Sequence, residues 1–259
     1  MFDIYQWSEP KIIIFILVFL RTFAFLISYP VFGSPQIPVH VKVLLPLVIS
    51  FTVFPSIWTN NTIEISFNDA ILWFAFKEVI LGLFFGTVAK MIFFSLNIAG
   101  QIISAAMGLS AAQFFNPYLG SQSTVIEQFQ FMIGSLFFLV INGHHLMLTG
   151  MIESFQIIPL TFDTLNIAGV KSAALIGQEI LVIGLKMSAP VLISILLTQV
   201  GMGIIGRVVP QINVLVTSLH LTILLGIFVI FMSAPMFLNQ VSGLKEYVAD
   251  SVIKIMKEF

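Results

Sequence analysis

The sequence contains no cysteine and very little charge. The lack of cysteine excludes disulfide bonds and thiol chemistry. The chain has 11 basic and 12 acidic side chains in 259 residues, a charged fraction of 9%, whereas an average soluble domain has roughly 25%. So few charges cannot cover the surface of an ordinary soluble enzyme, and a net charge of −1 excludes a nucleic-acid-binding protein.

Apolar side chains dominate instead. They make up 58% of the residues, and the mean hydropathy is +1.06. An apolar stretch of about 20 residues can cross a bilayer as a helix. Six regions of this kind occur, at residues 12–29, 42–58, 70–98, 129–149, 179–205 and 214–238. The sequence therefore predicts an all-α, polytopic membrane-associated protein with about six hydrophobic helical regions, in a single domain over residues 1–259.

Prolines punctuate these regions. Proline lacks a backbone N–H and disfavours helical geometry in the residue before it. Pro55, Pro159 and Pro210 therefore predict helix ends. Pro46 and Pro190 lie inside apolar regions and predict kinked or broken helices.

The last 21 residues, 239–259, have a different pattern. Charged side chains are interleaved there with apolar ones at helical spacing. The apolar positions are Val241, Leu244, Val248, Val252, Ile255, Met256 and Phe259. This pattern predicts an amphipathic C-terminal helix that lies on a membrane surface or against a partner.

Residues 91–126 carry no charge at all. In the first part, Gly100, Ser104 and Gly108 share one helical face, where small residues let another backbone approach closely. From 107 to 124, here called the charge-free segment, Asn116-Pro117 disfavours helix. Irregular backbone beside membrane helices is tolerated where protein buries it or where it lines a cavity. The charge-free segment is therefore either an interfacial loop or a loop that folds into a lumen and closes it with Phe and Met side chains.

Four ionisable residues inside the apolar regions are candidates for a functional site. They are Arg21, Lys77, Glu78 and Lys186. Arg21 follows Lys11 by ten residues, a depth of ~15 Å along a helix. An intramembrane charge indicates either a functional group or a structural ion pair, and Glu78 is the partner we expect for Arg21.

The sequence offers no catalytic or metal site. His144 and His145 are neighbours, which cannot easily chelate one ion on a helix, and no Cys, Asp or Glu lies three or four residues away. No hydrolase, zinc-protease or phosphate-loop motif is present. We therefore expect no metal, no cofactor and no enzymatic activity.

Several strings in chain order resemble one known family. Besides Arg21, they occupy residues 30–33, 37–42, 77–86, 99–103, 107–109, 116–117, 142–145, 153–155 and 206–214. The most specific are Asn142-Gly143-His144 and the Arg-x-x-Pro-Gln-x-Asn string over 207–213. With them the chain resembles the flagellar biosynthetic protein FliR and its injectisome counterparts, the export-gate subunits of type III secretion.

The resemblance implies an assembly and a location. Family members form a helical complex with FliP and FliQ subunits, with FlhB around its base and FlhA at the surrounding gate. Unfolded export substrates leave the cytoplasm through it. The chain would then be a multi-pass protein of the bacterial inner membrane, in contact with lipids and part of the flagellar basal body. Whether the machine is flagellar or an injectisome stays open.

The resemblance also implies which residues act. In the family, the loop after the third hydrophobic region projects into the lumen as a plug, which here is the charge-free segment. We expect large side chains at Met107, Phe114, Phe115 and Tyr118 to close the lumen around Asn116-Pro117, with hinges at Gly108 and Gly120. The family commonly has Asp-Pro where this chain has Asn116-Pro117, so a charge-based role does not transfer.

Other residues are expected to make packing or subunit contacts. These are Gly82, Gly86, Gly100, Ser104, Arg207, Pro210, Gln211 and Asn213.

A second hypothesis from another class is a transporter of a small solute. Intramembrane charges and a helix broken at Pro190 favour it, because transporters place both near the bilayer midplane. The lack of an internal repeat and the charge-free segment count against it.

Overall fold

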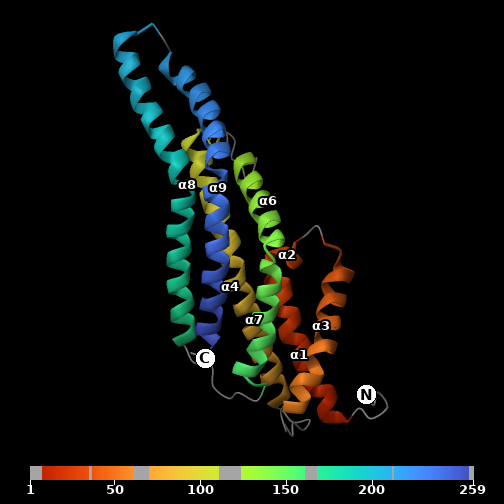
Figure 1. The fold of residues 1–259 in the computed structure, drawn as a ribbon. Helices are drawn as coiled ribbons and strands as arrows, with labels where there is room; N and C mark the ends of the chain where they lie inside the picture. Colours follow the sequence, from red (N-terminus) through yellow and green to blue (C-terminus); the bar gives the residue numbers. More distant parts are fainter. Residues whose placement is uncertain are drawn as a thin grey trace. The chain divides into compact units, whose positions relative to one another are not determined.

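The computed structural model describes residues 8–34, 37–60, 70–110, 124–160, 168–211 and 213–256. Within these ranges the chain forms helices and no strand, so the all-α prediction is confirmed (Figure 1). The helices are α1 (Glu9–Ser28), α2 (Pro30–Gly33), α3 (Val39–Asn60), α4 (Ala70–Ala106), α6 (Val125–Val140), α7 (Gly143–Ile157), α8 (Ala168–Val208) and α9 (Val214–Met256).

Most of these helices are long and apolar enough to cross a membrane. Five qualify alone, namely α1, α3, α4, α8 and α9. The pair α6 and α7 qualifies together but is bent by 68°. The predicted apolar region 129–149 is therefore two helices, and the break falls at Asn142, whose φ of 56° is left-handed. With this pair counted as one span, the total agrees with the six predicted regions.

Prolines end helices at some positions but not at others. Pro159 and Pro210 follow the ends of α7 and α8, as predicted. The predicted helix end at Pro55 is wrong, because Pro55 and Pro46 both lie inside α3. Pro190 likewise lies inside α8 and does not break it. Proline lacks the N–H that would bond the carbonyl four residues earlier, and membrane helices tolerate this loss where other groups take its place. The Ser50 and Ser194 hydroxyls donate to the carbonyls of Pro46 and Pro190 themselves, one turn back in each helix.

The chain packs as two compact units. The first comprises residues 1–91, 142–176 and 247–259, and the second comprises residues 92–141 and 177–246. Each has its own buried residues, which are described separately below.

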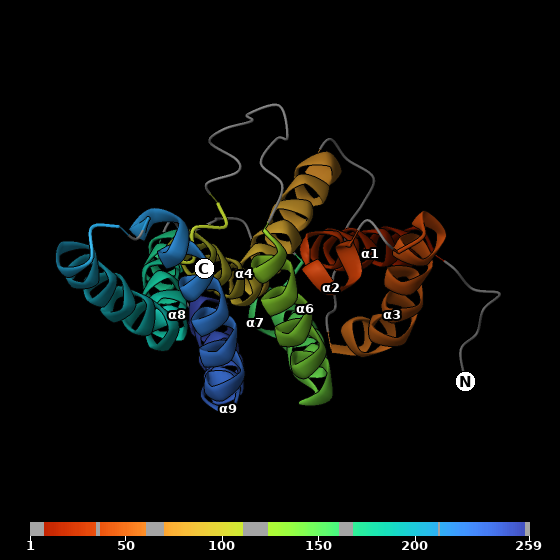
Figure 2. The ribbon, with the colours of Figure 1, turned by 90° about the horizontal axis from the view of Figure 1, so that it is seen from above.

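In the first unit α1 packs against α3 (Figures 1 and 2). Ring centroids of Phe15 lie 4.6 Å from Phe51 and 5.8 Å from Phe54. The opposite side of α1 is also covered, since Ile13 and Leu17 are buried. A flank of α1 with Ile12 and Ile16 stays exposed, so this helix is covered on most but not all of its surface.

The predicted amphipathic helix is not a separate element. It is the end of α9, which continues through Pro235 to Met256. Its apolar positions from Val241 to Met256 are buried, and Val252 and Met256 line a cavity of about 70 Å³ together with Phe25 of α1 and Met147 of α7. The apolar face at this end is thus covered by the chain itself. Phe259 lies outside the described residues.

The core of the second unit joins α4, α6 and α8. Its buried members are Ile103, Met107, Ile126, Val191 and Ile195, and residues of α9 such as Ile223 pack against them. Met107 is therefore a core residue at the end of α4.

Candidate functional site

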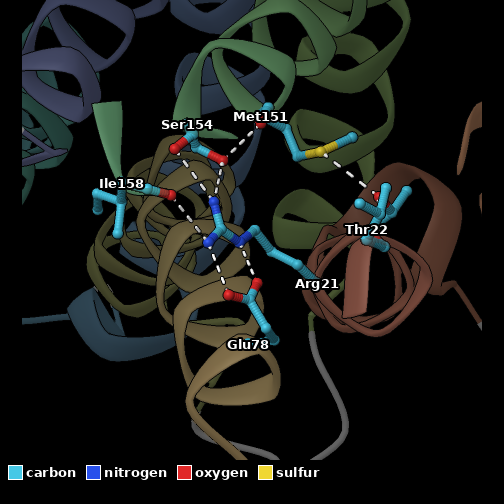
Figure 3. A network of polar contacts seen from close by, with 7 residues as sticks. Arg21, Thr22, Glu78, Met151, Ser154 and Ile158 are labelled. Atoms are coloured by element: carbon cyan, nitrogen blue, oxygen red, sulfur yellow. Dashed lines mark hydrogen bonds and ion pairs between the residues drawn. The ribbon is translucent and has the colours of Figure 1, made fainter. Parts of the chain in front are cut away.

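Arg21 lies in the middle of the first unit with its side chain fully buried. Its Nε donates to Oε2 of Glu78 on α4, and its Nη2 donates to Oε1 of the same carboxylate at 2.9 Å (Figure 3). Glu78 is only 2% exposed. The expected pairing of Arg21 with Glu78 is confirmed, and its geometry is bidentate, the arrangement that makes an arginine–carboxylate pair strong.

The same guanidinium also closes the C-terminal end of α7. Nη1 donates to the carbonyl of Ser154 at 3.1 Å and to its hydroxyl at 3.3 Å, and Nη2 donates to the carbonyl of Ile158 at 3.1 Å. The last carbonyls of a helix have no partner within it and carry partial negative charge, so a cation there satisfies both needs. Arg21 is thus a cap that α1 supplies to α7.

An aromatic ring completes the surroundings of Arg21. The guanidinium carbon lies 4.4 Å from the ring centroid of Phe155, close enough for a cation–π contact. The guanidinium has five N–H donors, and the structure gives five donor contacts to protein atoms. Its hydrogen-bonding capacity is therefore taken up within the chain.

Lys77, next to Glu78, faces another direction. Its ammonium lies 4.7 Å from the ring centroid of Phe74 and 5.8 Å from that of Trp73. Lys77 is buried, whereas Lys186 on α8 is exposed. Of the four predicted intramembrane charges, the structure brings Arg21 and Glu78 into one ion pair.

Gly82 and Gly86 hold α4 against α1. A Cβ at Gly82 would lie 2.4 Å from the Arg21 carbonyl oxygen, and one at Gly86 would lie 2.6 Å from the Phe25 carbonyl oxygen. No side chain fits at such distances from backbone. The two glycines therefore set the spacing that lets Arg21 reach Glu78.

In the second unit, α4 ends where the charge-free segment begins. Gly108 has a φ of +80°. The Gly108 N–H donates to the Ala105 carbonyl, and the Leu109 N–H donates to the Ser104 carbonyl. These two bonds form a Schellman motif, which satisfies the last carbonyls of a helix and favours glycine at the left-handed position. A hinge was predicted at Gly108, and the structure places there the residue that ends α4.

Two further contacts hold this helix end. Met107 is fully buried, and its carbonyl accepts a hydrogen bond of 3.4 Å from the Thr222 hydroxyl of α9. Gly226 provides the room, because a Cβ there would lie 2.9 Å from Met107 side-chain atoms. Met107 thus anchors the start of the charge-free segment in the core of the second unit, and its expected position in a lumen stays a prediction.

The other end of the segment lies against the same helix. The Thr124 hydroxyl, just before α6, is hydrogen-bonded to the Ser104 hydroxyl of α4. Gly100 lies against the first turn of α6, where a Cβ would be 2.6 Å from the Cα of Glu127. Gly100 and Ser104, predicted to share a packing face, both point to α6.

Known proteins are similar to this one over nearly the whole chain. Residues 12–247 match the family described as bacterial export proteins, family 1. The chain belongs to this family. The flagellar biosynthetic protein FliR of Bacillus subtilis (strain 168) is 36% identical over 212 residues, which is 81% of this chain and 81% of that protein. FliR of Escherichia coli (strain K12) is 28% identical over 80% of this chain and 79% of that protein. FliR of Aquifex aeolicus (strain VF5) is 28% identical over 88% of each.

These matches confirm the resemblance to FliR. The chain is a FliR-family protein, a polytopic membrane component of the flagellar export apparatus. The family match includes Arg21, Glu78 and both ends of the charge-free segment.

Not every predicted site residue of this FliR-family chain can be placed. Phe114, Phe115, Asn116, Pro117, Tyr118 and Gly120 lie outside the described residues. Arg207, Pro210, Gln211 and Asn213 are exposed where α8 ends and α9 begins. Among them, Asn213 accepts the Thr217 N–H at its backbone carbonyl (3.0 Å) and the Val216 N–H at Oδ1 (3.4 Å), so it caps α9.

Glu127 was not among the residues predicted from the sequence. This side chain is 9% exposed and forms a capping box with Thr124 at the start of α6. The spacing Thr-x-x-Glu before an apolar run is a known signal for a helix N-terminus, and it was present at 124–127. The predicted region started at 129, beyond this signal.

His144 and His145 are the neighbouring histidines considered above as metal ligands. The rings of His144 and His145 lie with centroids 4.1 Å apart. Among the residues that the structure describes, no group of three or more His, Cys, Asp or Glu side chains could hold an ion.

Proposed function

We propose that this chain is a structural subunit of the type III protein export channel, built with FliP and FliQ subunits, with FlhB and FlhA at the gate. Unfolded flagellar substrates cross the bacterial inner membrane through this channel. The charge-free segment closes the lumen, with Phe114, Phe115 and Tyr118 as the sealing side chains. The chain has no catalytic role in this proposal, so other components supply the driving force.

The observation that carries the proposal is the length of exposed apolar surface in the second unit. Large apolar side chains are exposed on α8 from Leu181 (52%) to Val208 (75%). At 1.5 Å per residue this stretch extends over about 40 Å. The hydrocarbon core of a bilayer is about 30 Å thick, so lipid alone leaves part of α8 uncovered unless the helix tilts steeply. Apolar helices of partner subunits would bury the part of the α8 surface that lipid does not cover.

Partner subunits can be tested by weighing the complex. The tagged chain would be purified from its native membrane in mild detergent and analysed by native mass spectrometry. We expect one copy of this chain bound to several copies of small helical subunits. An unrelated membrane complex from the same extract serves as the control for gentle handling. A monomer or homodimer, while that control complex stays intact, would contradict the proposal.

The seal can be tested by removing the middle of the charge-free segment. Replacing residues 111–120 by a short Gly-Ser linker leaves the Gly108 cap and Thr124 in place. We expect cells to leak monovalent ions while the complex still assembles, because the large side chains that fill the lumen are gone. In cells that lack the FliP subunit the same variant should not leak. Unchanged permeability with a fully assembled complex would rule out the seal.

The transporter hypothesis gains nothing from the geometry. Arg21 and Glu78 neutralise each other, and the donors of Arg21 are engaged by protein atoms. Pro190 does not break α8. Two of the charges that favoured a solute site, Arg21 and Glu78, therefore have a structural role, and α8 continues through Pro190.

A further inference from the structure

The polar contacts beside the charge-free segment form one connected group. Ser104 lies at the end of α4, and Thr124 immediately precedes α6. Their hydroxyls are hydrogen-bonded although 20 residues separate them in the sequence. The chain therefore leaves α4 and returns to it at nearly the same point.

Glu127 connects Thr124 to α6. The Glu127 N–H donates to the Thr124 hydroxyl at 3.3 Å, and the Thr124 N–H donates to Oε2 of Glu127 at 3.4 Å. These reciprocal bonds form a capping box, which fixes the direction in which the chain enters a helix. The negative carboxylate also suits the positive end of the helix dipole.

Glu127 also connects α6 to α4. Its Oε1 accepts a hydrogen bond of 3.1 Å from the side-chain amide of Gln101. Gly100 lets the helices approach, as described above. In the described part of the chain no ion pair involves Glu127. The negative carboxylate is therefore stabilised by hydrogen bonds and by the N-terminus of α6.

We propose that Glu127 is a positioning residue that holds the end of the charge-free segment entering α6 against α4, next to the place where the segment leaves that helix. The group of Gln101, Ser104, Thr124 and Glu127 is here called the clasp. The clasp holds the end of the segment that enters α6, and the Gly108 cap with the Thr222–Met107 bond holds the end that leaves α4. Its effect on sealing rests on the function proposed above, whereas its effect on the position of Thr124 does not.

The first test measures proximity by disulfide formation. The protein has no cysteine, so Ser104→Cys and Thr124→Cys introduce the only two thiols of the chain. Hydrogen-bonded hydroxyls place these side chains within reach of a disulfide. We expect rapid cross-linking in assembled complexes. Adding Glu127→Ala should slow it about fivefold, the size of effect that loss of a helix cap has on an equilibrium.

The matched control is Ser135→Ala in the same helix, because among the described residues the Ser135 hydroxyl donates to the Phe131 carbonyl one turn earlier and to no other group. It should leave the cross-linking rate unchanged. Failure to cross-link, or an equal rate with and without Glu127→Ala, would overturn the proposal.

The second test measures the ion leak in cells with the native Ser104 and Thr124. Glu127→Ala should leak, Ser135→Ala should not, and Glu127→Gln should remain close to wild type, because glutamine can also form a capping box. A leak from Glu127→Gln equal to that of the alanine variant would contradict positioning by hydrogen bonds.

The two proposals fail in different ways. If the 111–120 replacement leaks and Glu127→Ala does not, the clasp has no part in sealing and the seal stands. If the replacement does not leak, the seal is wrong, and the cross-linking rates still decide on the clasp.

Discussion

One guanidinium connects three helices of the first unit. Arg21 of α1 binds the carboxylate of Glu78 on α4 and the last carbonyls of α7. Removing one partner of a buried ion pair leaves an uncompensated charge, which destabilises a protein by about 3–5 kcal/mol. A substitution of Arg21 would also remove the cap of α7, so the two losses would occur together.

We therefore expect Arg21→Met to lower the amount of folded protein in the membrane strongly. Arg21→Lys should rescue it only partly, because an ammonium cannot make a bidentate contact and also reach two carbonyls. The measurement is the protein level and the melting temperature in detergent. Arg207→Lys, at an exposed position near the end of α8, is the control and should match wild type. A fully stable Arg21→Lys variant would contradict the cap.

The sequence predicted this pair only in part. Arg21 and Glu78 were identified because charges in apolar regions are rare, and ions in such places need partners. The carbonyls of Ser154 and Ile158 could not be predicted, because every residue has a carbonyl and only the fold shows which ones are free. Glu127 was missed for another reason, since it lies at the edge of an apolar region and not inside it.

The elements followed the sequence where apolar length decided their extent. α1, α3 and α9 begin within a few residues of the predicted regions. Local signals were less reliable. Pro55 did not end α3, whereas Asn142-Gly143 broke a region that hydropathy alone showed as continuous. A proline removes one donor from a helix, but a left-handed residue turns the chain, and so Asn142 has the larger effect.

The contact between α1 and α4 depends on two glycines. Gly82→Ala should separate these helices, because its Cβ would meet the Arg21 carbonyl and the Ala24 side chain, at 2.4 and 2.8 Å. We expect less folded protein and a lower melting temperature in detergent.

Gly150→Ala in α7 is the matched control, since nothing lies within 4 Å of its Cβ. Alanine there should be neutral or stabilising by roughly 0.5–1 kcal/mol, because it favours helix more than glycine does. Equal stability of the two variants would show that the close approach at Gly82 has no energetic importance.

At the scale of the whole molecule, composition predicted a membrane protein, and chain order predicted the family. Both are confirmed, the first by helices long and apolar enough to cross a membrane and the second by the family match over residues 12–247. Helix length went beyond the prediction. α8 has 41 residues and α9 has 43, so each is about 60 Å long and exceeds one bilayer crossing. Hydropathy windows locate apolar residues but do not show whether lipid or protein covers them.

The hydrogen bond between Ser104 and Thr124 has a consequence for labelling this protein. Because the two ends of the intervening stretch already meet, inserted residues need not push α4 and α6 apart, and doubling the length of a flexible loop costs only about 0.6 kcal/mol. An epitope or a photo-crosslinking peptide inserted there leaves the spacing of α4 and α6 unchanged. The same site would place a reporter where the proposed lumen lies, so one insertion can record which substrates pass.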